Sequence, residues 1–307
     1  MKIDYDKMER AFLDRICKYF GRFIPDEIFL KLMYKVRLGR KLELKEPKTF
    51  NAKLQWLKLY DRNPKYTELV DKIKVKKYIA GIIGEKYIIP TLKIFNSAKE
   101  IDFSELPNEF VLKCNHDSGT IYVCEDKRTL SIERMNDIRD YFDKALKRDW
   151  YLLGREWPYK NVSRKIFAES YMSDKKQEEL IDYKFMCFGG KVKCSFVCSD
   201  RKAKDGLKVT FFDREWNVMP FERHYSKSEK EIPCPQNYDL MIKLAEKVSE
   251  NIPFVRVDFY EIEGEIYFGE MTFYPGCGFE EFNPEEWDYE LGKWIELEKI
   301  DAKRKVN

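Results

Sequence analysis

The chain has 307 residues, and its 57 Lys and Arg nearly balance its 54 Asp and Glu, which leaves a formal net charge of +3. This balance argues against a generally basic nucleic-acid-binding protein, while 44% hydrophobic and 15% aromatic residues are too many for a disordered chain. The absence of an apolar run near 18 residues excludes a membrane-spanning helix, and the polar start at residues 1–6 lacks the apolar stretch of a signal peptide. We therefore expect a cytoplasmic protein.

The first 86 residues are predicted to be mainly helical. Leu, Ile and Phe recur at helical spacing over residues 7–38, with a break near Gly21. Two further helices are expected over residues 49–60 and 67–84, because each begins with a Thr whose hydroxyl can accept a free first-turn N–H. Four lysines at the start of the last helix are interpreted as a solvated face: Lys72, Lys74, Lys76 and Lys77.

From residue 87 onward, strand and helix patterns are mixed. Short apolar or alternating runs predict strands at 87–89, 110–114, 121–124, 166–171, 182–188, 191–198, 254–262 and 265–272. Amphipathic stretches predict helices at 131–150, 238–250 and 284–297. Gly189, Gly190 and Gly264 predict the tight turns of two hairpins. This order is typical of an α+β fold with antiparallel sheets rather than of repeated βαβ units.

The C-terminal hairpin carries the strongest chemical signal. Strand alternation places Arg256 and Asp258 on one face of its first strand, and Glu270 and Thr272 on one face of its second. A three-residue loop, 263–265, would set Asp258 directly opposite Glu270. Two facing carboxylates repel each other and lose hydration, so they need a cation, and such oxygen ligands suit Mg²⁺. The alternative is a solvated sheet face whose carboxylates pair with lysines.

A second candidate is the loop that follows the strand at residues 110–114. The strand carries Lys113, and the loop contains the small or polar residues Asp117, Ser118, Gly119 and Thr120. Small residues let backbone N–H groups approach phosphate oxygens, and a lysine supplies a point charge. The loop is not a GxxxxGK[ST] P-loop, and an ordinary turn is the alternative.

A third candidate is the strand at residues 166–171 with the acid and the lysine that follow it. The strand ends near Glu169, and Asp182 and Lys184 come on the next predicted strand. These groups could line an adenine and ribose slot, although an ordinary amphipathic strand would show the same pattern.

The order of these features resembles that of the ATP-grasp enzymes. The stretch from Arg256 to Gly276 resembles the metal-binding hairpin of carboxylate–amine ligases such as D-alanine–D-alanine ligase. From about residue 30 to residue 297 the chain is similar to the TupA-like ATP-grasp family, named for teichuronopeptide synthesis. The matching stretches are 47–51, 53–58, 110–115, 182–185, 254–270 and 284–288.

The resemblance implies an ATP-grasp fold in which a helical N-terminal region, 1–86, precedes a catalytic region, 87–307, with the nucleotide between residues 110–185 and 186–297. It implies that ATP contacts the following residues: Lys113 and the Asp117, Ser118, Gly119 and Thr120 loop at the phosphates, Glu169, Ser170 and Tyr171 at the adenine, Asp182 at the ribose, and Lys184 at phosphate or adenine. Asp258, Glu270 and Thr272 would bind Mg²⁺, and Arg256 and Lys113 would be the catalytic residues. This chain has Thr272 where ATP-grasp ligases commonly have Asn.

The implied activity is that of an ATP- and Mg²⁺-dependent ligase. It would join a carboxylate to an amine, such as an amino acid, through an acyl phosphate in bacterial surface or capsule polysaccharide synthesis. Three alternatives stay open: an ATP-grasp kinase for a sugar hydroxyl, a non-catalytic binding protein, and a glycosyltransferase, whose DxD metal motif has a match at residues 4–6. The donor, the acceptor, the oligomeric state and the role of the loop at residues 200–206 are left open.

Overall fold

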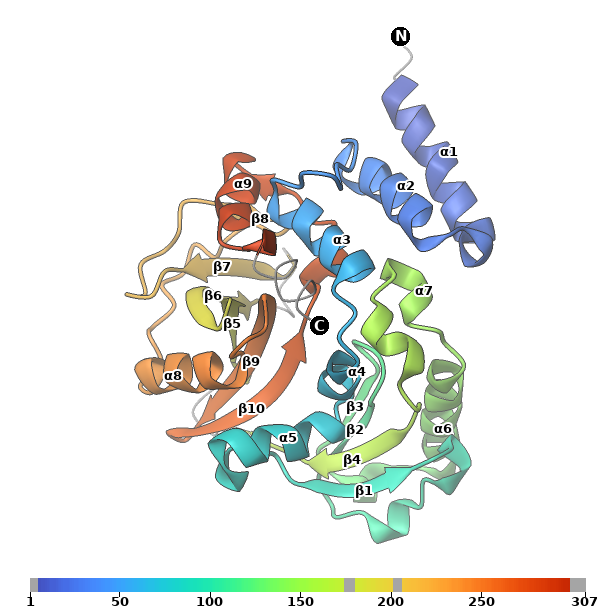
Figure 1. Cartoon of the computed structure of the whole chain (residues 1–307). Helices are drawn as coiled ribbons and strands as arrows, with labels where there is room; N and C mark the ends of the chain where they lie inside the picture. The colour runs from blue at the N-terminus through green and yellow to red at the C-terminus, as the bar shows by residue number, and fades with distance from the viewer. Residues whose placement is uncertain (1–4, 174–179, 201–205, 299–307) are drawn as a thin grey trace.

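The computed structural model describes residues 5–173, 180–200 and 206–298, and it contains two antiparallel sheets (Figure 1). The four-stranded sheet has the order β1-β4-β2-β3, and the five-stranded sheet has the order β10-β9-β5-β6-β7. A short two-stranded pair, β11-β8, lies apart from both. The predicted α+β class with antiparallel sheets is confirmed. Asp4 of the DxD match and residues 201–205 of the predicted loop lie outside the described residues.

The helices and strands have the following bounds. The α-helices are α1 (Tyr5–Phe20), α2 (Asp26–Leu38), α3 (Phe50–Tyr60), α4 (Lys65–Val70), α5 (Lys74–Ile83), α6 (Ile132–Leu146), α7 (Tyr151–Gly154), α8 (Tyr238–Val248) and α9 (Glu286–Lys293). The strands are β1 (Thr91–Phe95), β2 (Phe110–Cys114), β3 (Ile121–Cys124), β4 (Ile166–Ser170), β5 (Asp182–Phe188), β6 (Lys191–Ser199), β7 (Lys208–Phe212), β8 (Glu222–Arg223), β9 (Phe254–Ile262), β10 (Glu265–Thr272) and β11 (Phe282–Asn283).

The helical character of the first 86 residues is confirmed, but the single helix predicted over residues 67–84 is wrong. It is two helices, α4 and α5, because Asp71 starts a new one. The Asp71 Oδ1 atom accepts hydrogen bonds from the backbone N–H groups of Ile73 and Lys74, at 3.0 and 3.3 Å. The same oxygen accepts a bond of 2.9 Å from the side chain of Asn115, in the loop after β2. Asp71 therefore fixes the start of α5 against that loop.

Some of the predicted boundaries are also wrong. The strand predicted at residues 87–89 is wrong, because a short 3₁₀ helix occupies residues 85–87 and β1 begins only after Pro90. The predicted three-residue loop of the C-terminal hairpin has two residues, Glu263 and Gly264, both with positive φ, so that Glu265 pairs with Ile262. Helices α6 and α9 are shorter than predicted. The short strands β7, β8 and β11 were not predicted.

The sheets have separate apolar cores, with α5 lying between them. Helix α6 packs on the four-stranded sheet, where Phe110, Phe142 and Ile166 are buried. Helix α8 packs on the five-stranded sheet over residues such as Phe185 and Val257. Figure 1 shows α5 between β10 on one side and β1 and β4 on the other. This arrangement brings the start of α5 to the gap between the two sheets.

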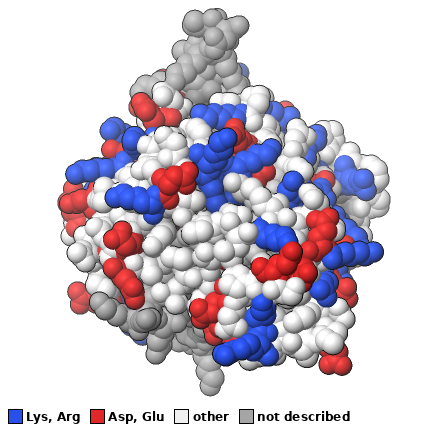
Figure 2. All heavy atoms as spheres, turned by 90° about the horizontal axis from the view of Figure 1, so that it is seen from below, with Lys and Arg blue, Asp and Glu red and all other residues white. Residues whose placement is uncertain are grey.

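The surface carries both signs of charge. Figure 2 shows Lys and Arg interspersed with Asp and Glu on the face seen from below, as the balanced composition predicts. Within the part of the chain that the structure describes, no helix is both long and apolar enough to cross a membrane.

Candidate functional site

A β-bulge in β10 brings the two carboxylates of the C-terminal hairpin together. The register shifts by one residue between Phe268 and Met271, so that Gly269 and Glu270 together stand opposite Asp258. A Cβ atom on Gly269 would lie 3.2 Å from the carbonyl oxygen of Asp258, which leaves little room for a side chain at this position. Asp258 and Glu270 thus face each other through a bulge, and not through the predicted three-residue loop.

The guanidinium of Arg256 lies between these carboxylates. Its Nε atom donates to Asp258 Oδ1 at 2.7 Å, and its Nη2 atom donates to Asp258 Oδ2 at 2.7 Å and to Glu270 Oε1 at 2.6 Å. The hydroxyl of Thr272 donates to the same Glu270 oxygen at 3.0 Å. The sheet therefore holds all four predicted residues of this group in direct contact.

A second cation, Lys184 on β5, completes this group. Lys184 pairs with Asp258 in the β5–β9 ladder, and its Nζ atom lies 2.6 Å from Asp258 Oδ2 and 2.5 Å from Asp182 Oδ2. Burial alone would raise the pKa of Glu270, but the charges of Lys72, Arg256 and Lys184 hold it well below its usual value. Glu270 is therefore a carboxylate at neutral pH.

A second cluster forms on the four-stranded sheet around Glu169. This carboxylate is almost fully buried, with Lys113 of β2 on its Oε1 atom and Lys76 of α5 at 2.8 Å from Oε2. Burial opposes the charge of Glu169, and the two lysines outweigh it and lower the pKa. The structure thus brings together two of the predicted site residues, Lys113 and Glu169, and adds Lys76, which was not predicted as a site residue.

The loop after β2 lies between the two clusters. Thr120 donates its hydroxyl to Asp117 Oδ2 at 2.5 Å, which holds the loop closed, while Ser118 and Gly119 are exposed at its tip. Gly119 has a φ of 90°, and a Cβ there would meet no heavy atom within 4 Å. The loop therefore presents an open backbone, as a phosphate-covering loop requires.

The interpretation of the α5 lysines as a solvated face is wrong for two of the four. Lys72, just before α5, donates to the backbone oxygen of Asp117 at 2.5 Å and lies 3.6 Å from Glu270 Oε2. Lys76, one turn later, reaches Glu169, whereas Lys74 and Lys77 are exposed. Their i, i+4 spacing was the available signal, but it does not reveal what the face contacts.

Two predicted residues lie at the edge of the second cluster. Ser170 ends β4, and its backbone N–H donates to the oxygen of Pro90 at 3.0 Å. The hydroxyl of Tyr171 lies 3.4 Å from Glu125 Oε1, on the side of β3. No hydrogen bond between these two side chains and Lys113 is found among the described residues.

A buried lysine supports the turn that follows β10, and sequence reasoning missed it. Lys58 of α3 is 1% exposed, and its Nζ atom donates to the backbone oxygens of Gly154 and Cys277 and to Gln55 Oε1, at 2.7 to 2.9 Å. Burial lowers the pKa of Lys58 to about 8. Cys277 lies in the turn Pro275–Gly278 with a φ of 54°, a conformation that these bonds hold in place.

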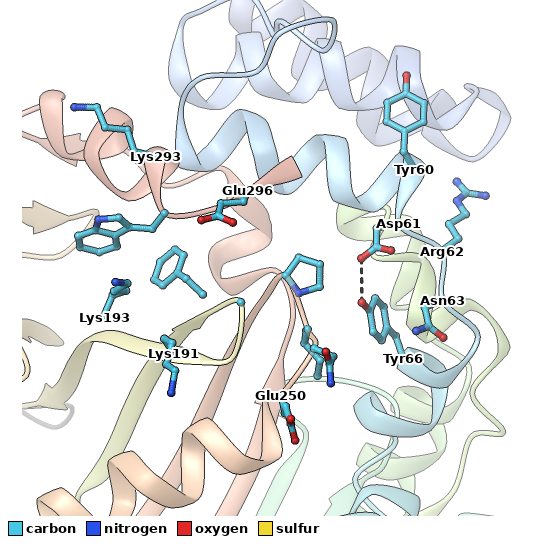
Figure 3. A pocket seen from close by; sticks show the side chains of 16 residues that line it. Tyr60, Asp61, Arg62, Asn63, Tyr66, Lys191, Lys193, Glu250, Lys293 and Glu296 are labelled. Carbon is cyan, nitrogen blue, oxygen red and sulfur yellow. Dashed lines mark hydrogen bonds between the residues drawn. The ribbon is translucent and has the colours of Figure 1, made fainter. Parts of the chain in front are cut away.

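A large cleft opens beyond the end of the five-stranded sheet (Figure 3). Its volume is about 1220 Å³, and it is walled by the end of α3, the β5–β6 turn, the loop before β9 and the end of α9. One lining residue, Tyr66, packs on Phe273 with ring centroids 4.4 Å apart, and Phe273 directly follows Thr272. The cleft thus lies next to the end of the C-terminal hairpin formed by β9 and β10. Residues of both charges and aromatic residues line it, including Asp61, Arg62, Lys191, Lys193, Lys293 and Trp294.

The facing carboxylates fit a small divalent cation. Oxygens of Asp258 and Glu270 lie within 2.7 Å of a single nitrogen of Arg256, so one compact cation can satisfy both. Within the described residues no group of three or more His, Cys, Asp or Glu is placed to hold a metal ion. Mg²⁺ needs few protein ligands because it keeps waters and bridges to phosphates, so the two carboxylates and the Thr272 hydroxyl suit it.

The solved structures to which the chain is similar include two D-alanine–D-alanine ligases and an ATP-grasp ligase. D-alanine–D-alanine ligase from Bacillus anthracis, complexed with ATP, shares 15% identity over 67% of this chain and 55% of its own, with a TM-score of 0.39. The same enzyme from Helicobacter pylori shares 12% identity over 75% and 61%, with a TM-score of 0.41. The ATP-grasp ligase PsnB, complexed with minimal precursor, Mg and ADP, shares 12% over 73% and 57%, with a TM-score of 0.38. The chain spans less than two thirds of the length of these structures.

The comparison with protein families is more specific. No curated protein sequence matches the chain. The sequence profile of the family described as TupA-like ATPgrasp matches residues 52–296, from α3 to the residues after α9. This match covers most of the chain, including both sheets and every predicted site residue. The chain therefore has the ATP-grasp fold and belongs to the TupA-like ATP-grasp family.

Proposed function

We propose that this protein is an ATP- and Mg²⁺-dependent ligase that forms an amide from a carboxylate and an amine. The observation that carries the proposal is the mixed-sign group on β9 and β10, in which Arg256 lies between Asp258 and Glu270, and Lys72 approaches Glu270 at 3.6 Å. A plain sheet face would not gather the buried Asp182 and Asp258 and the half-buried Glu270 around two cations, but a site for a nucleotide and its metal requires both signs.

The nucleotide would lie between the two clusters, with the four-stranded sheet on one side and the five-stranded sheet, which includes all of β5, on the other. Lys113, Lys76 and the open backbone at Ser118 and Gly119 would meet the phosphates, and Glu169 would orient the two lysines. Glu169, Ser170 and Tyr171 follow one another at the end of β4, which supports a role beside the adenine. Asp182 and Lys184 would contact ribose and phosphate.

The proposed reaction has two steps. A carboxylate oxygen of the donor attacks the γ-phosphorus, and the bond from that phosphorus to ADP breaks, which gives an acyl phosphate. The amine nitrogen then attacks the acyl carbon, phosphate leaves, and the nitrogen loses a proton to water. Arg256 stabilises charge on the transferring phosphoryl group, and the remaining site residues position the reactants.

Asp258, Glu270 and Thr272 would hold Mg²⁺. When bound, this ion neutralises phosphate charge and polarises the phosphoryl oxygens. Arg256 and Lys184 also contact these carboxylates, so that their positive charges offset part of the negative charge of the group.

The cleft of Figure 3 is the proposed entry for the substrates. Lys193 has no ion-pair or hydrogen-bond partner among the described residues, and with Lys191, Arg62 and Trp294 it offers cations beside an aromatic ring. Such a lining suits a sugar that carries a carboxylate, consistent with a role in surface or capsule polysaccharide synthesis in the bacterial cytoplasm.

An ADP-release assay across a panel of uronic acids and amino acids tests the proposal. The ligase requires both a carboxylate and an amine for sustained ADP release, together with Mg²⁺. ADP release that needs a sugar but no amine would instead identify a sugar kinase, and an absence of Mg²⁺-dependent ATP binding would identify a non-catalytic binding protein.

A further inference from the structure

The turn between α1 and α2 exposes an unusual group of aromatic side chains. Phe23 is 81% exposed, Tyr19 is 71% exposed and Phe20 is 62% exposed. Large apolar side chains that gather at one exposed place mark a binding surface. Figure 1 shows this turn at the edge of the molecule, beside α7 and away from β9 and β10.

The same turn is positively charged. Residues 15–23 contain the exposed cations Arg15, Lys18 and Arg22 and no Asp or Glu. The acids that begin α2 are already paired: Asp26 lies 2.9 Å from Arg62 Nη2, and Glu27 lies 2.6 Å from Lys31 Nζ. The exposed Asp14 on α1 directly precedes the stretch 15–23. The surface at residues 15–23, here called the aromatic turn, therefore carries more positive than negative charge around its rings, even with Asp14 counted.

The aromatic turn is held in a fixed position. Arg155, which is 2% exposed, donates through Nη2 to the backbone oxygens of Gly21 and Ile24, at 2.5 and 3.3 Å. Gly21 also packs closely against the ring of Phe29, because a Cβ there would lie 3.1 Å from it. The rings are thus presented to the outside by a braced turn.

We propose that the aromatic turn binds the surface of a membrane that contains anionic phospholipids. Phe and Tyr rings insert at the interface between headgroups and acyl chains, and neighbouring cations are attracted to anionic headgroups. A second copy of the chain fits less well, because a two-fold symmetric contact through this turn would bring Arg15, Lys18 and Arg22 against their own copies. This inference does not depend on the ligase chemistry.

Vesicle flotation of the full-length chain tests the proposal. The protein should float with vesicles of phosphatidylglycerol and phosphatidylcholine, and much less with phosphatidylcholine alone. Changing the three cations together, R15E/K18E/R22E, should weaken partitioning on the order of 100-fold, at roughly fivefold for each cation removed. Changing the three rings together, Y19S/F20S/F23S, should abolish it.

The matched control changes exposed apolar residues elsewhere, as I132S/V218S/Y289S, and should float like the wild type. The proposal is overturned if the wild type does not float with vesicles of either lipid composition. It is equally overturned if the control variant loses flotation as the ring variant does. It is also overturned if light scattering without lipid shows a dimer that Y19S/F20S/F23S dissociates, because the turn would then bind a second copy.

Discussion

Arg256 Nη2 lies 2.6 Å from Glu270 Oε1, across the ladder between β9 and β10. Because the same nitrogen also contacts Asp258, the three side chains form one electrostatic unit on adjacent strands. Removal of one side chain leaves the charge of another without its partner. A substitution at any one of the three residues should therefore disturb the other two.

Glu270→Gln keeps the shape of the side chain but removes its charge. We expect ATP-dependent activity to fall at least about 100-fold, because this carboxylate faces the proposed metal and orients Arg256. Steady-state ADP release measures the change, and circular dichroism checks the fold. Glu265→Gln, at the exposed start of the same strand, is the matched control. Wild-type activity in Glu270→Gln would exclude the metal assignment.

Lys76→Met tests whether the helical N-terminal region contributes to nucleotide binding. Removal of a cation that meets phosphate should raise the Kd for ATP about 10- to 100-fold, as for the loss of a charged hydrogen bond. Its neighbour Lys77 is exposed, so Lys77→Met should leave the Kd unchanged. Isothermal titration with ATP and Mg²⁺ compares the two. Equal affinities would show that α5 stands outside the nucleotide site.

Lys58 should make stability depend on pH in the alkaline range. Its pKa is about 8 in the folded chain and returns to about 10.5 on unfolding. Between these values the unfolded chain holds one more proton at this site, so the free energy of unfolding rises with pH. Relative to Lys58→Met, the wild type should gain up to about 3 kcal/mol from pH 8 to pH 10.5. Urea unfolding of both proteins measures this; a difference that stays constant with pH would contradict the lowered pKa.

Substitutions in the cleft should weaken binding of the carboxylate substrate and leave ATP binding unchanged. Lys193→Glu reverses the charge of one cleft cation, and Trp294→Ala removes an aromatic wall. We expect each variant to raise the KM for a uronic acid about tenfold, as for the loss of one charged contact, with the KM for ATP unchanged. Lys243→Glu, exposed on α8 outside the cleft, is the control. A parallel rise in both KM values would mean that these cleft residues stabilise the fold and do not bind the substrate.

The faces of strands could be predicted from the sequence, and the register of the hairpin could not. Period-two alternation placed Arg256, Asp258, Glu270 and Thr272 correctly on one face, because it depends only on the backbone. The register depends on the length of the loop and on the bulge at Gly269. The one-residue bulge compensates for the shorter loop. The alternation of side chains within one strand does not predict this bulge.

The direction of the α5 lysines could not be predicted for a related reason. Helical spacing shows that Lys72 and Lys76 share a face, but a charged face is usually solvated. Only the packing of Val75 and Ile79 into the core, together with the break at Asp71, turns that face toward Glu169 and Glu270. Tertiary contacts far along the chain thus decide what a local pattern means.

Lys72 and Lys76 have a further consequence, because they belong to the helical part of the chain while the groups that they contact belong to the two sheets. A nucleotide held by all of them would bind only the assembled molecule. By mass action it would stabilise the association of α5 with both sheets, so that ATP becomes part of what keeps the two regions docked. A chain that began at residue 87 would lose both lysines and Lys58, and with them this link between ligand binding and assembly.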